Sequence, residues 1–294
     1  MPSLFIFGCK TRPEHSLIVF ACLRQVWYED FPHLKFRPKT MHSVCSQCVR
    51  HRHLIKSLNH HLAARKRQLQ AYTAHLRQQY RDRLEYWASR GRSRSKGHEL
   101  SLIIDSMDQA KFGFPRGPSM RSKDLSNFNR PRCHITGLIL HGRAVMLSIS
   151  DHDLPKSSST MIELVASALT RLKASGVVLS ELDLRIQSDN TVREMKNNPF
   201  LRYLAMMVSN GIVKSARLAC LTSGHSHEDI DQLFGSLAMF LVRKCRVAST
   251  PLDFKECLEL FLSKLPRPHE PDRWVIKLDA VRDWNHGSPR WSSV

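Results

Sequence analysis

The stretch Gly224 to Gly235, GHSHEDIDQLFG, combines two histidines and three acids at the start of an amphipathic helix. Ser226 is the expected N-cap, with Asp229 at the capping-box position. On a helical wheel, Asp229 and Asp231 flank the apolar stripe, whereas Glu228 points away from it. For Glu228 and Asp229, an alternative is that they only complement the helix dipole. The apolar stripe consists of Ile230, Leu233, Phe234, Leu237 and Leu241.

The segments before this helix alternate between short strands and helices. We expect strands at 100–105, 134–141, 144–150, 182–187 and 213–221, and helices at 157–174 and 199–210. This β-β-β-α-β-α-β-α order resembles the ribonuclease H-like fold. That fold implies an α/β protein with a mixed five-stranded sheet flanked by helices, in which the first and fourth strands run parallel and adjacent.

Three acids fall where such a fold brings its elements together. Asp105 ends the first strand, Asp189 follows the fourth, and Asp231 lies one turn into the last helix. Hard divalent cations take oxygen ligands, and a pair of Mg²⁺ or Mn²⁺ ions about 4 Å apart can activate one oxygen and stabilise another. The sequence therefore predicts a carboxylate metal site. The alternative for each acid alone is a turn-forming role.

Three motifs carry a family resemblance. They read DSMDQAKF from Asp105, DNTVREMKN from Asp189 and GHSHEDID from Gly224. With them, the segment from about Trp87 to Arg246 resembles an uncharacterised eukaryotic domain family associated with transposable elements. That family has a G-H-T-H-E-D-I-D signature, in which Thr is usual where this chain has serine.

A more distant resemblance concerns the last helix. The run from Ile230 to Phe234 is similar to the helix that carries the third acid in DDE/D transposases and retroviral-type integrases. This resemblance favours Asp231 over Asp229 as the third ligand. It implies a divalent-metal-dependent nuclease or polynucleotidyl transferase domain of transposon origin. Supporting roles, including hydrogen bonds that orient an acid or a phosphate, are expected for Asp108, Asn190, His225, His227 and Asp229.

Two other functions stay open at this stage. Domains of this kind can keep their shape and lose activity, which would leave a catalytically inactive, domesticated or decayed nucleic-acid-binding protein. The other alternative is an interaction scaffold that forms dimers through a long helix.

The chain is strongly basic, and much of the excess lies in one segment. It has 45 Lys and Arg against 26 Asp and Glu, a net charge of +19, which favours a nucleic-acid partner. From Leu54 the periodicity predicts one helix of about 35 residues ending near Gly91. Between Val49 and Lys96 there are thirteen Lys and Arg against two acids, a net +11. We expect phosphate contacts, to DNA rather than RNA. Candidate contact residues are Arg65, Lys66, Arg67, Lys111, Arg116 and Lys196.

A half zinc motif precedes this helix. Cys45 and Cys48 have C-x2-C spacing, which presents two thiolates to one tetrahedral Zn²⁺. Two more ligands are needed. His51, His53 or His42 could supply them, or a distant pair such as Cys9 and Cys22. The alternative is that both cysteines are reduced and bind no metal.

Composition also sets the expected compartment and domain organisation. No apolar run reaches the length of a membrane span, and acidic and basic residues interrupt the N-terminal apolar runs, so we expect neither a membrane partner nor a secretory signal. Eight cysteines with one close pair do not indicate a disulfide framework, which predicts a reducing compartment. The location that we expect is the nucleus. We expect four regions: 1–53 with the knuckle, 54–97 with the basic helix, 98–246 with the ribonuclease H-like domain, and a C-terminal region, 247–294.

Overall fold

The structure is a computed structural model. It describes Glu29, Gly117 and residues 45–107, 132–222, 224–225, 228–245 and 247–284. The chain divides into two compact units, 1–43 and 44–294, and all of these residues except Glu29 belong to the second.

A six-stranded mixed sheet forms the centre of this unit. Its strand order is β5-β4-β1-β2-β3-β6. Strand β1 pairs antiparallel with β2 and parallel with β4. The predicted parallel pairing of the first and fourth strands is therefore confirmed. The prediction of five strands is wrong, because β6 pairs parallel with β3 at the far edge. The strands are β1 (Glu99–Ser106), β2 (His134–Leu140), β3 (Ala144–Ser150), β4 (Asp183–Ser188), β5 (Ser215–Cys220) and β6 (Asp272–Leu278).

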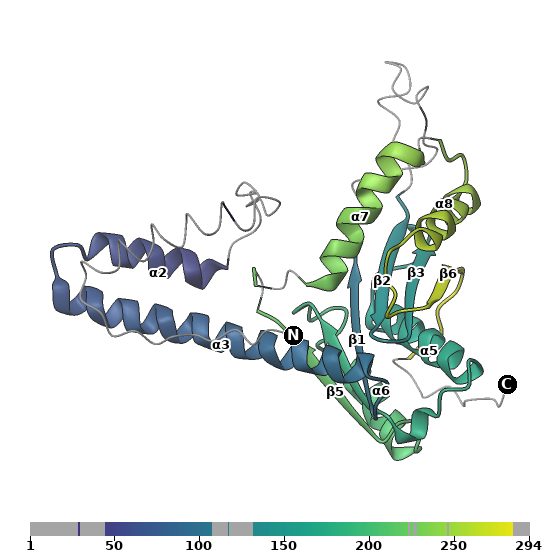
Figure 1. Ribbon diagram of the computed structural model, residues 1–294, viewed down its shortest axis with the longest axis horizontal. Coiled ribbons are helices and arrows are strands. Elements are labelled where there is room, and N and C mark those ends of the chain that lie inside the picture. The colour runs from purple at the N-terminus through teal and green to yellow at the C-terminus, as the bar shows by residue number, and fades with distance from the viewer. Residues whose placement is uncertain are drawn as a thin grey trace. The chain divides into compact units, whose positions relative to one another are not determined.

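Helices cover both faces of the sheet (Figure 1). Helices α5 (Ser158–Ala174) and α6 (Asn198–Ser209) pack on one face, and α7 (Asp229–Lys244) and α8 (Pro251–Ser263) pack on the other. Side chains of a strand alternate between faces, so Leu102 and Ile104 of β1 join the core under α5, whereas Ile103 joins the core under α7. Asp105 has the parity of Ile103. It therefore lies on the α7 face.

The basic segment forms two helices, so the prediction of a single long helix from Leu54 is wrong. Helix α2 (Ser46–Ser57) ends before α3 (Leu62–Arg94), and α2 packs alongside α3 (Figure 1). The break contains Asn59, His60 and His61, which have low helix propensity. The reversal is fixed by side-chain contacts such as Arg52 Nε to Tyr72 Oη, 3.1 Å.

Helix α3 also runs past Gly91, where the sequence predicted its end. Tertiary contacts outweigh the low helix propensity of glycine, because the last turns of α3 lie on the sheet. Tyr86 Oη lies 2.9 Å from His141 Nε2, and Ser93 Oγ donates to His141 O at 2.6 Å. Gly142 has φ +76°, and a Cβ there would lie 2.6 Å from Ser93 O.

Helix α7 starts later than the sequence predicted. Its N-cap is Glu228, not Ser226, and the capping-box partner is Asp231, not Asp229. Asp231 Oδ2 accepts a hydrogen bond from the backbone N–H of Glu228 at 2.9 Å. The predicted apolar face is confirmed, since Ile230, Phe234 and the rest of the stripe are buried.

Two further features concern the cysteines and the membrane. A disulfide joins Cys245 to Cys257, a pair that the sequence did not predict. Within the described part of the chain, no helix is both long and apolar enough to cross a membrane. The four predicted regions stay a prediction, although β6 and α8, from beyond residue 246, pack on β3.

Candidate active site

The ends of β1 and β4 bring two of the predicted acids together. The parallel register pairs Ile103 with Gln187. Asp105 lies two residues beyond this pair on β1, and Asp189 lies two residues beyond it, just after β4 ends at Ser188. Both residues have the parity that faces α7, because Leu184 and Ile186 of β4 point into the opposite core. The parallel register therefore brings both acids to the same end of the two strands.

The third acid reaches the same place because α7 approaches β2 closely. Asp105 pairs with Gly137 across the antiparallel β1–β2 ladder. A Cβ at Gly137 would lie 3.0 Å from both Ile230 Cδ1 and Phe234 Cε1. The missing side chain thus lets the first turn of α7 sit on the sheet beside Asp105, and Asp231 follows Ile230 in that turn.

Asp105, Asp189 and Asp231 line one small cavity of about 40 Å³. Glu228 contributes to its wall, and apolar lining comes from Ile104, Leu221 and others. The three predicted acids therefore converge from β1, from the end of β4 and from α7. Their oxygens do not form a tight cage, since the described His, Cys, Asp and Glu side chains that meet within 4.8 Å belong to another group.

Asp105 is the acid whose charge is most disfavoured in this cavity. Burial, reinforced by the negative charges of Asp189 and Asp231, raises the pKa of Asp105 to about 7, although the backbone N–H of Ser106 donates to its carboxylate at 2.7 Å. Burial likewise raises the pKa of Glu194, with Asp189 adding to the effect. A bound cation would relieve this repulsion.

Local hydrogen bonds hold Asp189 in a turn. Its Oδ1 accepts from the backbone N–H of Thr191 at 3.3 Å and also from the Thr191 hydroxyl. Asn190, a predicted supporting residue, accepts from Lys196 Nζ at 3.2 Å. The turn-forming alternative therefore describes part of what Asp189 does. One oxygen is used in the turn, while the residue still lines the cavity.

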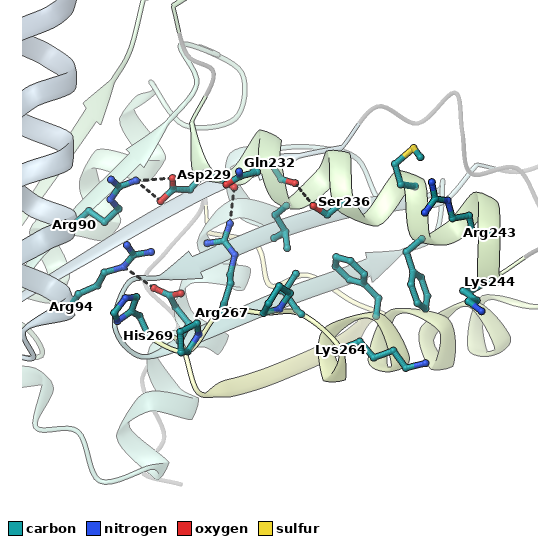
Figure 2. A pocket seen from close by; sticks show the side chains of 18 residues that line it. Arg90, Arg94, Asp229, Gln232, Ser236, Arg243, Lys244, Lys264, Arg267 and His269 are labelled. Atoms are coloured by element: carbon teal, nitrogen blue, oxygen red, sulfur yellow. Dashed lines mark hydrogen bonds and ion pairs between the residues drawn. The ribbon is translucent and has the colours of Figure 1, made fainter. Parts of the chain in front are cut away.

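The other two acids of the GHSHEDID motif bind helix α3. Arg90 Nη1 lies 2.7 and 2.9 Å from the two carboxylate oxygens of Asp229 (Figure 2). Glu228 pairs with Arg83 at 3.1 Å and accepts from Trp87 Nε1 at 3.2 Å. Asp229 lies in a separate, larger pocket of about 770 Å³ between α7, α8 and the end of α3. The carboxylate of Asp229 therefore holds α3 against the start of α7 through Arg90.

The first histidine of the same motif, His225, lies beside the cysteines of α2. His225 Nε2 is 3.2 Å from Cys48 Sγ, and His75 Nε2 is 3.3 Å from the same sulfur and 3.7 Å from Cys45 Sγ. The four ligand atoms lie within 4.8 Å of one another. The predicted cysteines therefore do meet two histidines, but these are not His51 and His53.

The remaining predicted residues divide into two sets. On α3, Lys66 and Arg67 are exposed and Arg65 is half-buried; Lys196 lies beside the Asp189 turn. The others lie outside the described residues: Asp108, Lys111, Arg116 and His227, with the alternative zinc ligands Cys9, Cys22 and His42.

Three residues that the structure brings to these sites were not among the predicted site residues. Glu194 acts electrostatically on Asp105, and Glu228 lines the cavity. Glu194 stands inside the DNTVREMKN motif, so its spacing was a usable signal. His75 had none, because it lies 27 residues beyond Cys48, outside the spacing of a local zinc motif.

The fold and these acids define an α/β domain with a candidate carboxylate metal site at the ends of two inner strands of a mixed sheet. Residues 123–281, more than half of the chain, match a family described as a domain of unknown function (DUF7869). The chain belongs to this family.

Solved structures give weaker likenesses. The Mos1 transposase paired-end complex with left transposon end is 12% identical, with 90% of this chain and 84% of that chain covered and a TM-score of 0.40. The Mos1 strand transfer complex is also 12% identical, with 88% and 82% covered and a TM-score of 0.32. No curated protein matches the chain.

Proposed function

We propose that the chain is a divalent-metal-dependent nuclease or polynucleotidyl transferase domain of the transposase and integrase type. The observation that carries the proposal is the convergence of Asp105, Asp189 and Asp231 on one cavity from three different elements. Each acid alone could serve a turn or a helix cap. Turn formation and capping do not require three half-buried carboxylates to line the same cavity.

The donor set fits Mg²⁺ or Mn²⁺. All three side chains offer oxygen, the ligand atom that these hard cations prefer, and the burial of Asp105 leaves a charge that a cation would stabilise. When bound, divalent cations activate an attacking oxygen and stabilise the leaving oxygen of a phosphodiester. Asp105, Asp189 and Asp231 would hold them. Lys196, held beside Asp189 through Asn190, supplies positive charge for the substrate backbone.

The basic arm, α2 and α3, supports nucleic acid as the substrate. Its exposed cations include Lys66, Arg67, Arg77 and Arg81, all on α3. The Arg83–Glu228 and Arg90–Asp229 pairs attach this helix to the loop that leads to Asp231. Nucleic acid bound along α3 would therefore lie on the helix whose ion pairs reach the start of α7, where Asp231 lies. We infer DNA as the substrate and the nucleus as the location.

The proposal is tested by incubating the purified chain with nicked and branched DNA in Mg²⁺ or Mn²⁺. Asp189→Asn and Asp231→Asn should each lower the cleavage rate by at least about 100-fold, because an amide is a poor ligand for these cations. Asp231→Asn keeps an oxygen acceptor for the N–H of Glu228, so the helix cap and the melting temperature should change little.

Asp153→Asn is the matched control, because Asp153 is an exposed acid whose side chain is 84% accessible. It should cleave at the wild-type rate. Cleavage that persists in Asp189→Asn and Asp231→Asn would remove these acids from the mechanism. Should wild type itself show no metal-dependent cleavage of either DNA, the enzymatic proposal is wrong and a binding role remains.

The binding role has its own measurement. Several phosphate contacts should make the logarithm of the DNA affinity fall steeply with the logarithm of the salt concentration. Replacing Lys66 and Arg67 with alanine should reduce that slope by up to about two. A flat salt dependence in wild type would contradict nucleic-acid binding by the arm.

A second candidate role, self-association, is favoured by one observation on α3. Five large apolar side chains lie within about 80° of each other on the helical wheel, and each is at least 40% exposed. We name this the apolar stripe of α3; it consists of Leu62, Leu69, Leu76, Tyr80 and Leu84. A second copy of the same helix would bury it.

A further inference from the structure

The cysteine and histidine cluster joins three segments that are distant in sequence. Cys45 caps α2 and Cys48 lies in its first turn, His75 is in the middle of α3, and His225 is in the loop before α7. Both cysteines are less than 5% exposed, and both histidines are half-buried. The cluster therefore lies where the arm meets the loop that leads to the acidic site.

We propose that Cys45, Cys48, His75 and His225 bind one structural Zn²⁺. Zinc–sulfur bonds of about 2.3 Å and zinc–nitrogen bonds of about 2.05 Å, at the tetrahedral angle, place sulfur and nitrogen about 3.5 Å apart. The measured sulfur–nitrogen distances are 3.2, 3.3 and 3.7 Å. Three of the six distances within the ligand set are thus close to those of a zinc tetrahedron, and the other three do not exceed 4.8 Å.

Hydrogen bonds alone explain this arrangement less well. An imidazole nitrogen carries either one proton or one lone pair, so His75 Nε2 can bond well with only one of the two sulfurs that face it. A cation in the centre satisfies all four atoms at once. Two thiolates also neutralise Zn²⁺, and two imidazoles complete the coordination. Four protein ligands leave no open position, which indicates a structural site.

The position of α2 gives a second argument. Of its 12 residues only Cys48 is fully buried, and Leu54 and Ile55 are half-buried, so hydrophobic burial holds this helix on α3 only in part. A helix of three turns gains stability from any further constraint. Metal binding supplies one, because its free energy adds to the stability of the state that brings the ligands together.

His225 extends the effect of the metal to the acidic site. The backbone O of His225 accepts from Arg83 Nη2 at 2.7 Å, and Arg83 also pairs with Glu228, the N-cap of α7. Zinc bound to His225 therefore fixes the loop whose next turn carries Asp231. The zinc site positions the acidic site without contacting a substrate, and the assignment does not depend on nuclease activity.

Metal analysis of the purified chain is the direct test. Wild type should contain about one zinc per chain, and Cys48→Ser, His75→Ala and His225→Ala should each lose most of it. Cys220→Ser and His53→Ala are matched controls, because Cys220 is a free cysteine outside the cluster and His53 is an exposed histidine of α2. Both should keep full zinc content. Zinc that survives His225→Ala but not His53→Ala would overturn this ligand set.

A spectroscopic test on wild type avoids variants that fail to fold. Co²⁺ added to the metal-free chain should give the intense visible bands of a tetrahedral site and a sulfur-to-metal charge-transfer band. Zinc should displace it. Chelation should also speed hydrogen exchange in α2 and in the loop before α7, but not in β2 and β3. A chain that binds neither metal, or whose Co²⁺ spectrum is octahedral, would refute the proposal.

Discussion

At Asp105, a half-buried carboxylate lines the same cavity as two other acids, so its ionised form destabilises the folded state. Its pKa of about 7 lies above that of an unfolded aspartate, so the folded state holds a proton that the unfolded state releases. The associated stability is fully present below about pH 4, and it is lost as the pH rises through 7. In a metal site, a bound cation offsets this destabilisation because it binds the folded state.

We predict that wild-type stability in EDTA falls by about 2 to 3 kcal/mol between pH 5 and pH 8 through this residue. Asp105→Asn should lack that part of the fall, because an amide does not titrate. Urea unfolding at the two pH values measures the difference. Asp153→Asn, at an exposed site, should behave as wild type.

Mg²⁺ or Mn²⁺ gives the complementary result. Either cation should raise the melting temperature of wild type at pH 8 and leave that of Asp105→Asn almost unchanged, because binding to the folded state stabilises it. An equal rise in both proteins would show that Asp105 is not a ligand.

At the scale of single elements, the approach of α7 to the sheet decides whether the third acid reaches the site. Gly137 on β2 makes that approach possible, since a Cβ there would lie 3.0 Å from Ile230 Cδ1 and Phe234 Cε1. Gly235, on α7 itself, has no atom within 4 Å of a Cβ position. The two glycines therefore form a matched pair.

Gly137→Ala should destabilise the fold by about 1 to 3 kcal/mol through overpacking and should lower any metal-dependent cleavage, because Asp231 moves away from Asp105. Gly235→Ala should stabilise the fold by about 0.5 to 1 kcal/mol, because alanine is the better helix former. Chemical denaturation and the cleavage assay measure both variants. Similar effects from the two would contradict the packing argument.

The docking of α3 on the sheet depends on a second glycine. Gly142 and Gly176 both have positive φ, +76° and +87°, but only Gly142 faces the backbone of α3. Alanine at Gly176 should cost about 1 kcal/mol through backbone strain alone. Alanine at Gly142 should cost at least about 2 kcal/mol more and should speed hydrogen exchange in the last turns of α3. Equal costs would show that the contact with Ser93 is unimportant.

For the whole molecule, the arm carries two surfaces with different chemistry. Its cations suit a polyanion, and the apolar stripe of α3 suits a second copy of the helix. The two do not exclude each other, because Arg67 and Arg81 lie off the stripe on the helical wheel.

We predict that the chain self-associates through this stripe at micromolar concentration and that Leu69→Lys with Leu76→Lys shifts it to monomer. The added charges would be buried without partners in a helix pair. Light scattering after size-exclusion chromatography measures the mass. Val178→Lys changes an even more exposed apolar residue outside the arm and should leave the mass unaltered. A wild type that is monomeric at every concentration would refute self-association.

Some of this organisation could be predicted from the sequence because it rests on local periodicity. The order of strands and helices and the buried face of α7 follow from apolar spacing, and the resemblance of that order to the ribonuclease H-like fold implied the parallel neighbours β1 and β4. Asp105 and Asp189 were predictable as a pair for the same reason. The break between α2 and α3 was not, because the apolar pattern continues across it, and β6 could not be assigned to an edge from its own residues.

The sequence alone determined which residue types stand at the strand ends and at the start of α7, and hence that three acids could meet. Tertiary structure decided the rest, because contacts between distant segments leave no periodic trace. Only the folded chain shows that Glu228 and Asp229 hold α3 through Arg83 and Arg90, and that His75 joins His225 and the two cysteines. One motif thus divides its residues between a cavity, an ion-pair anchor and a candidate zinc site.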